Sequence, residues 1–218
     1  MKIKWYGHAA FQITTGKGTR IIIDPYEHGG FNGALSYGRI QDESDIVMTS
    51  HDHADHNYVK DIPGKYNHVS KAGDYEINDV KITAIPTFHD NSGGKEKGGN
   101  LVFVISADAL VLVHMGDIGH GLDPEQLKKI GKVDVLLLPV GGFFTVDAAE
   151  ASKIMNAIRP VITIPMHYKT EKCGFPIAPV ENFINSQKNV RVLKESSVMI
   201  SRGELPKEPE IIVLQHAL

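Results

Sequence analysis

Short apolar or alternating segments recur along the chain and give the first structural prediction. Each is four to eight residues long and rich in β-branched side chains, and most are bounded by Gly, Pro, Asn or Asp. Segments of this kind are typical of strands. We therefore predict strands over residues 2–6, 10–14, 20–24, 45–49, 80–87, 100–106, 109–115, 134–140, 161–166, 190–193 and 197–201.

Three further segments predict helices that cover these strands. Residues 123–130 open with an Asp-Pro start signal, residues 147–158 have helical apolar spacing, and residues 179–187 follow the same pattern. The first three strands resemble successive hairpins, whereas strands and helices alternate after Pro124. This order predicts an α/β (α+β) fold of two packed sheets with helices outside. No linker divides the chain, so we expect one domain over residues 1–218.

Composition limits the class of protein. A chain of 218 residues with 42% hydrophobic and 22% charged residues is typical of a folded globular protein. The net charge of −3, with Lys and Arg spread along the chain, argues against a nucleic-acid partner. Met1 leads directly into the first strand and no run of about eighteen apolar residues occurs, so we expect a cytoplasmic protein without a membrane span. The single cysteine, Cys173, cannot form an internal disulfide.

Glycine-rich stretches at residues 28–33, 91–100 and 141–144 are interpreted as surface loops. Neither G-x-x-x-x-G-K-[ST] nor a strand-bound G-x-G-x-x-G is present, which disfavours a nucleotide-binding fold. Phe143 and Phe144 lie in the last stretch, where they either form a subunit contact in an oligomer or pack over a site. We expect loops such as 28–38 and 91–100 to decide the substrate.

The strongest chemical signal is the segment His51, Asp52, His53, Ala54, Asp55, His56, which directly follows a predicted strand. Residues two apart in an extended segment point the same way, so His51 and His53 can face one ion together. If the chain then turns into a helix after Asn57, Asp55 and His56 project toward a neighbouring position. Four donors within six residues crowd one tetrahedral ion but suit two adjacent ions.

Three other predicted strands also end in metal-type donors, namely His89, Asp117 and His167. Sites in sheet proteins gather where loops leave the carboxyl ends of strands. Each residue alone is weak evidence, because such residues are more often turn, cap or satisfied polar groups. Together the five histidines and two aspartates exceed the four ligands of a closed structural site, and they fit two ions that share a bridging group.

With these motifs the sequence resembles the metallo-β-lactamase superfamily, whose signature H-x-H-x-D-H is present from His51 to His56. The other family motifs occur in the family's order, as Asp24 in IIIDP, His89 in TFHD, Asp117 in MGD and His167 in PMHY. The opening WYGHAAFQI, which contains His8, resembles the branch of ascorbate-6-phosphate lactonase-like and N-acyl-phosphatidylethanolamine phospholipase D-like hydrolases. The resemblance covers nearly the whole chain and implies a four-layered αββα sandwich with metals at one edge.

The resemblance also implies the ligand sets. One ion takes His51, His53 and His89, the other takes Asp55, His56 and His167, and Asp117 bridges them. We expect two zinc ions, with manganese or iron as alternatives. Asp24 is interpreted as a carboxylate that orients a ligating imidazole, or equally as a turn-forming residue before Pro25.

The chemistry expected of such a site is hydrolysis. Two metal ions lower the pKa of a bridging water toward about 7, so that a metal-bound hydroxide attacks an ester, lactone or phosphodiester. Asp55 is expected to be both a ligand and the catalytic residue that handles the proton. The charge of two dications exceeds that of two aspartates and one hydroxide, which favours an anionic small-molecule substrate.

Four residues close to the motifs are candidates for substrate contacts: His8, His120, Tyr168 and Lys169. Each is at least equally interpreted as an ordinary polar residue of a loop or strand. His114 lies within a predicted strand and is expected to pack there. His28, His68 and His216 have no neighbouring donor motif, so we do not include them in the site.

Other classes of function compete with this prediction. A redox diiron protein uses the same scaffold, but that family has a carboxylate where this sequence has His53. A noncatalytic metal-binding relative is expected to have lost ligands, and Asp55 is intact. Nucleases of the superfamily often carry an inserted domain between the motifs of Asp117 and His167, where this chain has room for two strands and two helices. Hydrolysis is therefore the favoured prediction.

Overall fold

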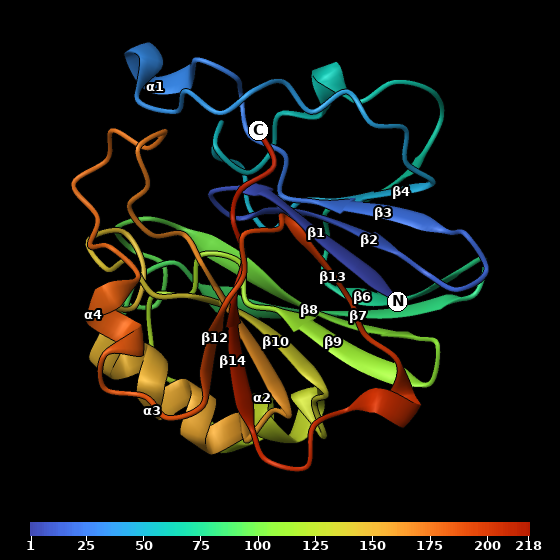
Figure 1. Cartoon of the computed structure of the whole chain (residues 1–218). Helices are drawn as coiled ribbons and strands as arrows, with labels where there is room; N and C mark the ends of the chain where they lie inside the picture. The colour runs from blue at the N-terminus through green and yellow to red at the C-terminus, as the bar shows by residue number, and fades with distance from the viewer.

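The computed structural model describes residues 1–218, and its strands form two sheets that face each other (Figure 1). The first sheet begins with antiparallel pairing of the three N-terminal strands and continues with parallel pairing. Its six strands, in spatial order, are β13 (Ser197–Met199), β1 (Lys2–Gly7), β2 (Ala10–Thr14), β3 (Arg20–Ile23), β4 (Ile46–Met48) and β5 (Asn67–Val69).

The second sheet combines an antiparallel half, from β6 to β9, with a parallel half. The parallel half includes the strands that alternate with helices after Pro124, as the sequence predicts. Its eight strands, in spatial order, are β12 (Val190–Val192), β14 (Glu210–Val213), β11 (Ile162–Met166), β10 (Val135–Pro139), β9 (Leu110–His114), β8 (Gly99–Ala107), β7 (Val80–Phe88) and β6 (Gly73–Ile77).

The main hydrophobic core lies between the two sheets. In β3, Ile21 and Ile23 belong to a core cluster of 47 buried residues, whereas Ile22 belongs to a separate cluster of 12 on the outer face. Successive side chains of a strand point to opposite faces, so this division follows the alternation directly. Burial on both faces of β3 explains why Ile21, Ile22 and Ile23 follow one another without a polar residue between them.

Helices cover the outer face of the eight-stranded sheet (Figure 1). They are α2 (Pro124–Ile130), α3 (Ala148–Ile158) and the single turn α4 (Glu181–Ile184). Asp123 and Asp147 cap α2 and α3, because their carboxylates accept hydrogen bonds from backbone N–H groups in the first turn. Both helices therefore begin where the sequence predicts, whereas the predicted helix 179–187 is reduced to one turn.

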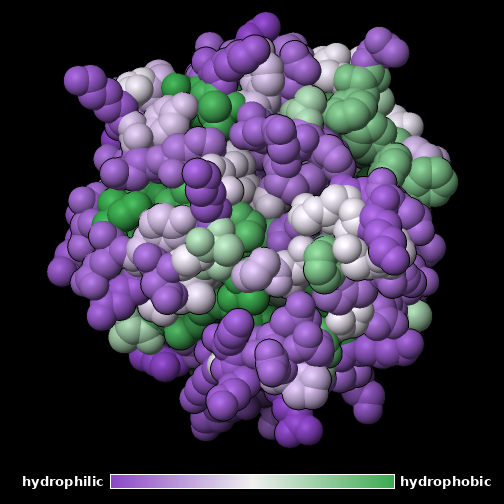
Figure 2. Space-filling model, turned by 180° about the vertical axis from the view of Figure 1, so that it is seen from behind, coloured by the Kyte–Doolittle hydropathy of each residue, from purple (hydrophilic) through white to green (hydrophobic).

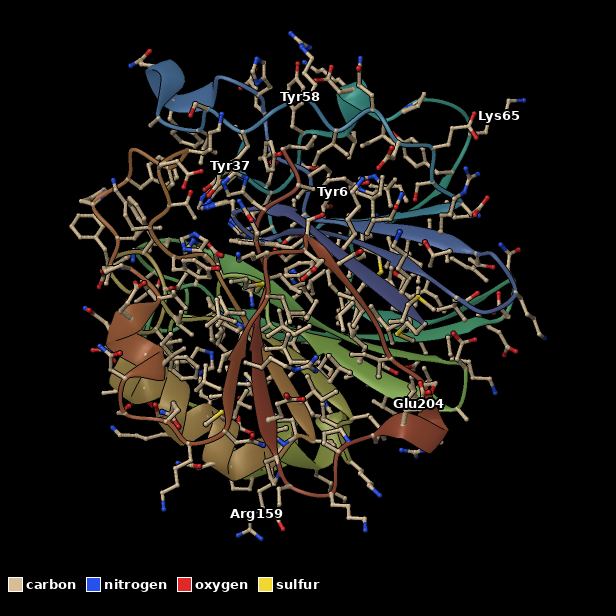
Figure 3. All side chains as sticks on the ribbon, in the orientation of Figure 1. Tyr6, Tyr37, Tyr58, Lys65, Arg159 and Glu204 are labelled. Atoms are coloured by element: carbon tan, nitrogen blue, oxygen red, sulfur yellow. The ribbon has the colours of Figure 1, made fainter.

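Loops form most of the layer outside the six-stranded sheet. This layer contains the short turns α1 (Gly30–Gly33) and η1 (Val59–Asp61), while η2 (Arg202–Glu204) precedes β14. Tyr6 and Tyr37, which are labelled in Figure 3, are buried in this layer. The sequence allows a helix in the segment after Asn57, but that segment forms the three-residue η1 and no α-helix.

All eleven predicted strand segments contain a strand of the structure, and the mixed α/β architecture with two facing sheets is confirmed. Three strands were not predicted: β5, β6 and β14. None of the helices has the length and apolar character that crossing a bilayer requires.

Candidate metal centre

Four strand ends meet at one edge of the sandwich, as the sequence predicts. The loop after β4 carries the H-x-H-x-D-H segment, and the residues that follow β7, β9 and β11 are His89, Asp117 and His167. Strands that run in the same direction bring their carboxyl ends to one edge, so residues distant in sequence become neighbours. The structure brings all seven predicted donors together.

One group of donors, which we call the outer cluster, consists of His51, His53 and His89. Their ligand-type atoms lie within 4.8 Å of one another. The ring centroids of His51 and His53 are 4.5 Å apart, and those of His51 and His89 are 4.8 Å apart. His53 is exposed, His51 is half-buried and His89 is buried. Three imidazoles of this cluster therefore face one position that solvent reaches.

A second group, the inner cluster, consists of Asp55, His56, His167 and His8. Their ligand-type atoms also lie within 4.8 Å of one another, and all four residues are buried. The sequence predicts the first three in one site but leaves His8 among the substrate contacts. Instead, His8 Nε2 donates to Asp55 Oδ2 at 3.1 Å, and its ring lies 4.1 Å from that of His167.

Asp117 lies between the two clusters. Its Oδ2 atom is 3.3 Å from His89 Nε2 in the outer cluster, and 3.1 Å and 3.3 Å from His56 Nε2 and His167 Nε2 in the inner cluster. The backbone N–H of Asp117 donates to Asn100 Oδ1 at 2.9 Å. One carboxylate oxygen thus faces three imidazole nitrogens, which is the arrangement that a bridging ligand needs.

The residue before Asp117 must be glycine, because the backbone there passes close to Asn100 and Ser50. Gly116 has a φ of 56°, and a Cβ atom there would meet Asn100 Oδ1 at 2.2 Å and Ser50 Cβ at 2.8 Å. A larger residue would therefore be strained and would displace both neighbours. The MGD motif places its carboxylate through this close contact.

Three buried site residues adopt the left-handed conformation that non-glycine residues rarely use. The φ values are 53° for His8, 48° for Asp24 and 52° for His167. Each such residue costs roughly 1–2 kcal/mol, and such strain concentrates at functional sites. The strand ends are therefore bent to aim these side chains at the centre.

Unpaired polar atoms in both clusters show that these residues fit a metal. Buried atoms without a hydrogen-bond partner include His51 Nε2, His56 Nε2, both ring nitrogens of His167, and Asp117 Oδ1. Buried polar atoms normally have partners, and leaving one unpaired costs about 1–3 kcal/mol. Imidazole nitrogens and carboxylate oxygens are the donors that zinc and similar ions bind. The cluster is able to bind metal.

Asp24 and Ser50 determine which ring nitrogen two of these histidines present. Asp24 Oδ2 accepts hydrogen bonds from His56 Nδ1 at 2.9 Å and from Ser50 Oγ at 2.6 Å. Because the single Ser50 hydroxyl proton goes to Asp24, Ser50 Oγ accepts from His51 Nδ1 at 2.9 Å. His51 and His56 therefore both direct Nε2 at the centre, which is the nitrogen left to bind a metal.

The pKa shifts of these donors show that the centre favours positive charge. Burial and the neighbouring His56 lower the pKa of His51 to about 3, so its imidazole is neutral. Burial also lowers the pKa of His56, but Asp117, Asp55 and Asp24 outweigh it and hold that pKa well above its ordinary value. Burial raises the pKa of Asp117, yet His167 and His56 hold it well below its usual range. The carboxylates thus favour positive charge at the centre.

The other predicted contact residues lie away from this centre. Both ring nitrogens of His120 are used by the backbone: Nε2 accepts from Phe88 N–H at 3.1 Å, and Nδ1 is 2.6 Å from Gly121 O. Tyr168 is buried against Trp5, with ring centroids 5.1 Å apart. Lys169 Nζ donates to Phe175 O at 2.8 Å. Each of these contacts is structural.

The histidine in β9 is packed, as the sequence predicts. His114 is fully buried, its Nδ1 accepts from Gly116 N–H at 3.0 Å, and its Nε2 donates to Ala9 O at 3.0 Å. Cys173 is buried in the cluster outside the six-stranded sheet. Two supporting residues were not predicted, Ser50 and Asn100. Ser50 directly precedes the H-x-H-x-D-H segment, whereas Asn100 lies outside every motif, and only the fold shows which partners their side chains contact.

A cavity of about 600 Å³ opens beside the two clusters. Its floor contains His53, Asp55, His89 and Asp117, so both clusters and the residue between them contact it. Its wall contains Phe31, Phe144 and Phe175. A volume of this size is typical of small-molecule sites.

Comparison with known proteins agrees with this centre. A family model described as "Beta-lactamase superfamily domain" matches residues 2–167. A protein from Thermococcus onnurineus named metal-dependent hydrolase is 34% identical over 195 residues, which cover 78% of this chain and 85% of that protein. A protein of the same description from Pyrococcus horikoshii is 32% identical over 198 residues, covering 78% of this chain and 85% of its own.

Solved structures share the fold. One from Thermotoga maritima, described as a candidate zinc-dependent hydrolase of the metallo-β-lactamase superfamily, is 32% identical, has a TM-score of 0.81, and covers 98% of this chain and 97% of its own. A diiron β-hydroxylase from Streptomyces venezuelae is 14% identical with a TM-score of 0.57, covering 79% of this chain and 46% of its own, and shows the fold alone. The finer branch suggested by the opening WYGHAAFQI stays a prediction. The chain belongs to the β-lactamase superfamily, among the metal-dependent hydrolases of that family.

Proposed function

We propose that this protein is a hydrolase with two metal ions that cleaves an ester, lactone or phosphodiester. The observation that carries the proposal is the pair of donor clusters that share Asp117. Each cluster presents at least three metal-type donors, and in each cluster some buried ring nitrogens lack a hydrogen-bond partner. One ion alone would leave half of these donors unpaired, which is unfavourable for buried polar groups.

The outer cluster would hold one ion through His51, His53 and His89, and the inner cluster would hold the other through Asp55, His56 and His167. Asp117 would contribute to both. Imidazole and carboxylate donors suit zinc, with manganese or iron as alternatives. When bound, the ions would acidify a water molecule near neutral pH and stabilise the negative oxygen that develops on the substrate.

Asp55 is the residue that we assign to proton transfer. It lines the cavity and also belongs to the inner cluster, so it lies beside both substrate and metal. Burial raises its pKa, but the nearby His56 and the hydrogen bond from His8 outweigh burial and hold the carboxyl ionised. An ionised carboxylate at this position can accept a proton from the attacking water.

No serine or cysteine nucleophile is required. Cys173 lies in the hydrophobic layer outside the six-stranded sheet, and burial raises the pKa of its thiol. The substrate is expected to carry or develop negative charge, because two dications outweigh the two carboxylates of Asp55 and Asp117.

A redox diiron function is the competing proposal on this scaffold. Its expected pattern places a carboxylate where this chain has His53, and the outer cluster contains imidazoles alone. The donor set therefore supports hydrolysis over oxidation.

Metal content and hydrolysis, measured on the same purified samples, test the proposal. We expect about two zinc or manganese ions per chain, with turnover of a chromogenic phosphodiester or lactone that is lost in Asp55→Ala. Asp52→Ala is the matched control, because Asp52 lies in the same loop but belongs to neither cluster and accepts from Asn57 Nδ2. That variant should keep its metal. Activity that resists chelation, or tightly bound iron without hydrolysis, would reject the proposal.

A further inference from the structure

Three phenylalanine rings form a continuous apolar wall over the metal centre. The rings of Phe31 and Phe175 meet edge to face with centroids 5.2 Å apart, and those of Phe144 and Phe175 do so at 5.5 Å. They come from three separate segments, namely α1, the loop after β10 and the loop after β11. Aromatic rings in such contact provide a large apolar surface with fixed geometry.

The position of Phe31 is not what core packing alone would produce. Its side chain is 48% exposed, and its backbone is left-handed with φ 54° and ψ 49°. The turn is fixed at its base, because Gly174 N–H donates to Ala34 O at 2.6 Å and Ser36 N–H donates to Lys172 O at 2.9 Å. The fold thus tolerates backbone strain and keeps a large ring partly in solvent, at the cavity.

Hydrophobic groups gather on this side of the surface. Figure 2 shows the molecule from behind, with a hydrophobic patch at the upper right. Because α1 lies at the upper left of Figure 1, the half-turn between the two views brings α1 to this same side. Phe143 adds a ring that is 68% exposed and 4.8 Å from that of Phe144, although Phe143 does not line the cavity. Exposed patches of this kind mark ligand-binding grooves or interfaces.

Outside the two clusters, acidic side chains outnumber basic ones in the cavity. Its charged lining residues there are Asp52, Glu96 and Lys97. Lys97 Nζ donates to Phe144 O at 2.8 Å and to Phe143 O at 3.1 Å, so two of its three N–H donors are already used. A phosphate distant from the metals would therefore face two carboxylates and one ammonium group with a single remaining donor.

The loop that carries Lys97 is itself held in place. Asp90 accepts from the backbone N–H groups of Ser92, Gly94, Glu96 and Lys97 at 2.8–3.0 Å. This fixed loop positions Lys97 against the carbonyls of the loop that carries Phe144. The ammonium group thus acts as a support for the aromatic wall.

We infer that the substrate is a carboxylic ester or lactone with an apolar acyl substituent, and that Phe31, Phe144 and Phe175 bind this substituent. The inference rests on the proposed function, since the scissile carbonyl would lie at the metal centre. It narrows the substrate class, because a phosphodiester with a charged remote group fits the wall poorly. Phe31 is then a specificity-determining residue rather than a catalytic one.

The test compares p-nitrophenyl acetate with p-nitrophenyl hexanoate on metal-loaded protein. Each buried methylene favours binding, so we expect kcat/KM for the hexanoate to exceed that for the acetate by about tenfold or more. Phe31→Ala should remove most of this preference, so that the ratio of kcat/KM for the hexanoate to kcat/KM for the acetate falls toward one. Phe31→Leu should retain it, and Phe143→Ala should behave as wild type. Equal loss on both esters, or faster hydrolysis of bis(p-nitrophenyl) phosphate than of the hexanoate, would overturn the inference.

A binding measurement separates this inference from the proposed function. Calorimetric titration of Asp55→Ala with p-nitrophenyl hexanoate and with p-nitrophenyl acetate measures binding of each ester without turnover. Tighter hexanoate binding without hydrolysis by wild type would support the wall and reject the hydrolase mechanism. Hydrolysis without any chain-length preference would reject the wall and leave the mechanism standing. If the protein shows no chain-length preference and wild type hydrolyses neither ester, both the aromatic wall and the hydrolase mechanism are rejected.

Discussion

The inner and outer clusters use similar donors in different surroundings. Every residue of the inner cluster is buried, whereas the outer cluster includes the exposed His53 and the half-buried His51. In the inner cluster, His56 donates to Asp24 and Asp55 accepts from His8, so two donors have fixed orientations. In the outer cluster only His51 has such support, through Ser50. The inner cluster is therefore preorganised, and the outer cluster is open to the cavity.

This difference suggests a division of roles. A buried, hydrogen-bonded donor set loses little freedom when an ion binds, so the inner ion should bind more tightly. The outer cluster meets the cavity directly through His53 and His89, so its ion should contact the substrate first. Variants that act on one cluster at a time can break or sharpen this contrast.

The largest contrast is expected between His167→Ala and His53→Ala. Removing buried His167 should empty the inner cluster and lower kcat by roughly a thousandfold, the several kcal/mol that a metal supplies. Removing His53 should weaken only the outer ion, so excess metal in the assay should restore much of the activity. Metal content and activity against metal concentration measure both effects. Equal rescue of the two variants would contradict the division.

A smaller effect on both clusters is expected from Asp24→Asn. The change keeps the shape of a side chain with no exposed surface but removes the charge that orients His56 and, through Ser50, His51. Loss of such a supporting partner typically weakens metal affinity by about 10–100-fold. Competition with a chromogenic chelator measures this metal affinity. Asp45→Asn, whose carboxylate pairs with Arg20 far from either cluster, is the control. Unchanged affinity in Asp24→Asn would show that the network is dispensable.

The next variant, His8→Ala, should act on the inner cluster alone. It removes the hydrogen bond to Asp55 and the ring that packs against that of His167, so we expect a loss of about tenfold in the affinity of the tighter ion. The affinity of the weaker ion should stay as in wild type. A two-step metal titration measures the affinity of each ion separately. A change in the affinity of the weaker ion alone would contradict the assignment of His8 to the inner cluster.

The smallest effect is expected from His120→Ala. This residue braces the backbone at Phe88 and Gly121 without contacting the cavity, so its loss should cost about 1 kcal/mol of unfolding free energy. Metal content and kcat should be unchanged. Thermal unfolding and activity assays on one sample test this, and a large fall in kcat with intact stability would return His120 to the substrate site.

The sequence predicts most of the fold because its strands are strongly apolar. β10 is VLLLP and β11 is ITIPM, and both are buried along their whole length. In contrast, β6 is GDYEI and β5 is NHV, and most residues of both strands are exposed. Such polar strands are held by their neighbours in the sheet, so their own residues give little signal. β14 is EIIV, with three buried apolar residues like those of β3, so its sequence could have revealed it.

The metal-type donors follow from the sequence because each ends a strong strand, whereas their surroundings depend on the fold. Tyr168 and Lys169 follow His167 in sequence, but Tyr168 is buried against Trp5 and Lys169 Nζ donates to Phe175 O, so neither lines the cavity. His8 comes close to Asp55 only because β1 and the loop after β4 meet at one edge of the six-stranded sheet. The aromatic wall likewise combines three loops whose shapes no local pattern reveals.

Anomalous X-ray diffraction at the absorption edge of the bound metal, on crystals of the metal-loaded protein, tests the central claim most directly. The account predicts two peaks, one in each cluster, with Asp117 contacting both and the inner peak more fully occupied. A single peak in a protein that hydrolyses its substrate, or two equally occupied peaks of which neither contacts Asp117, would contradict it.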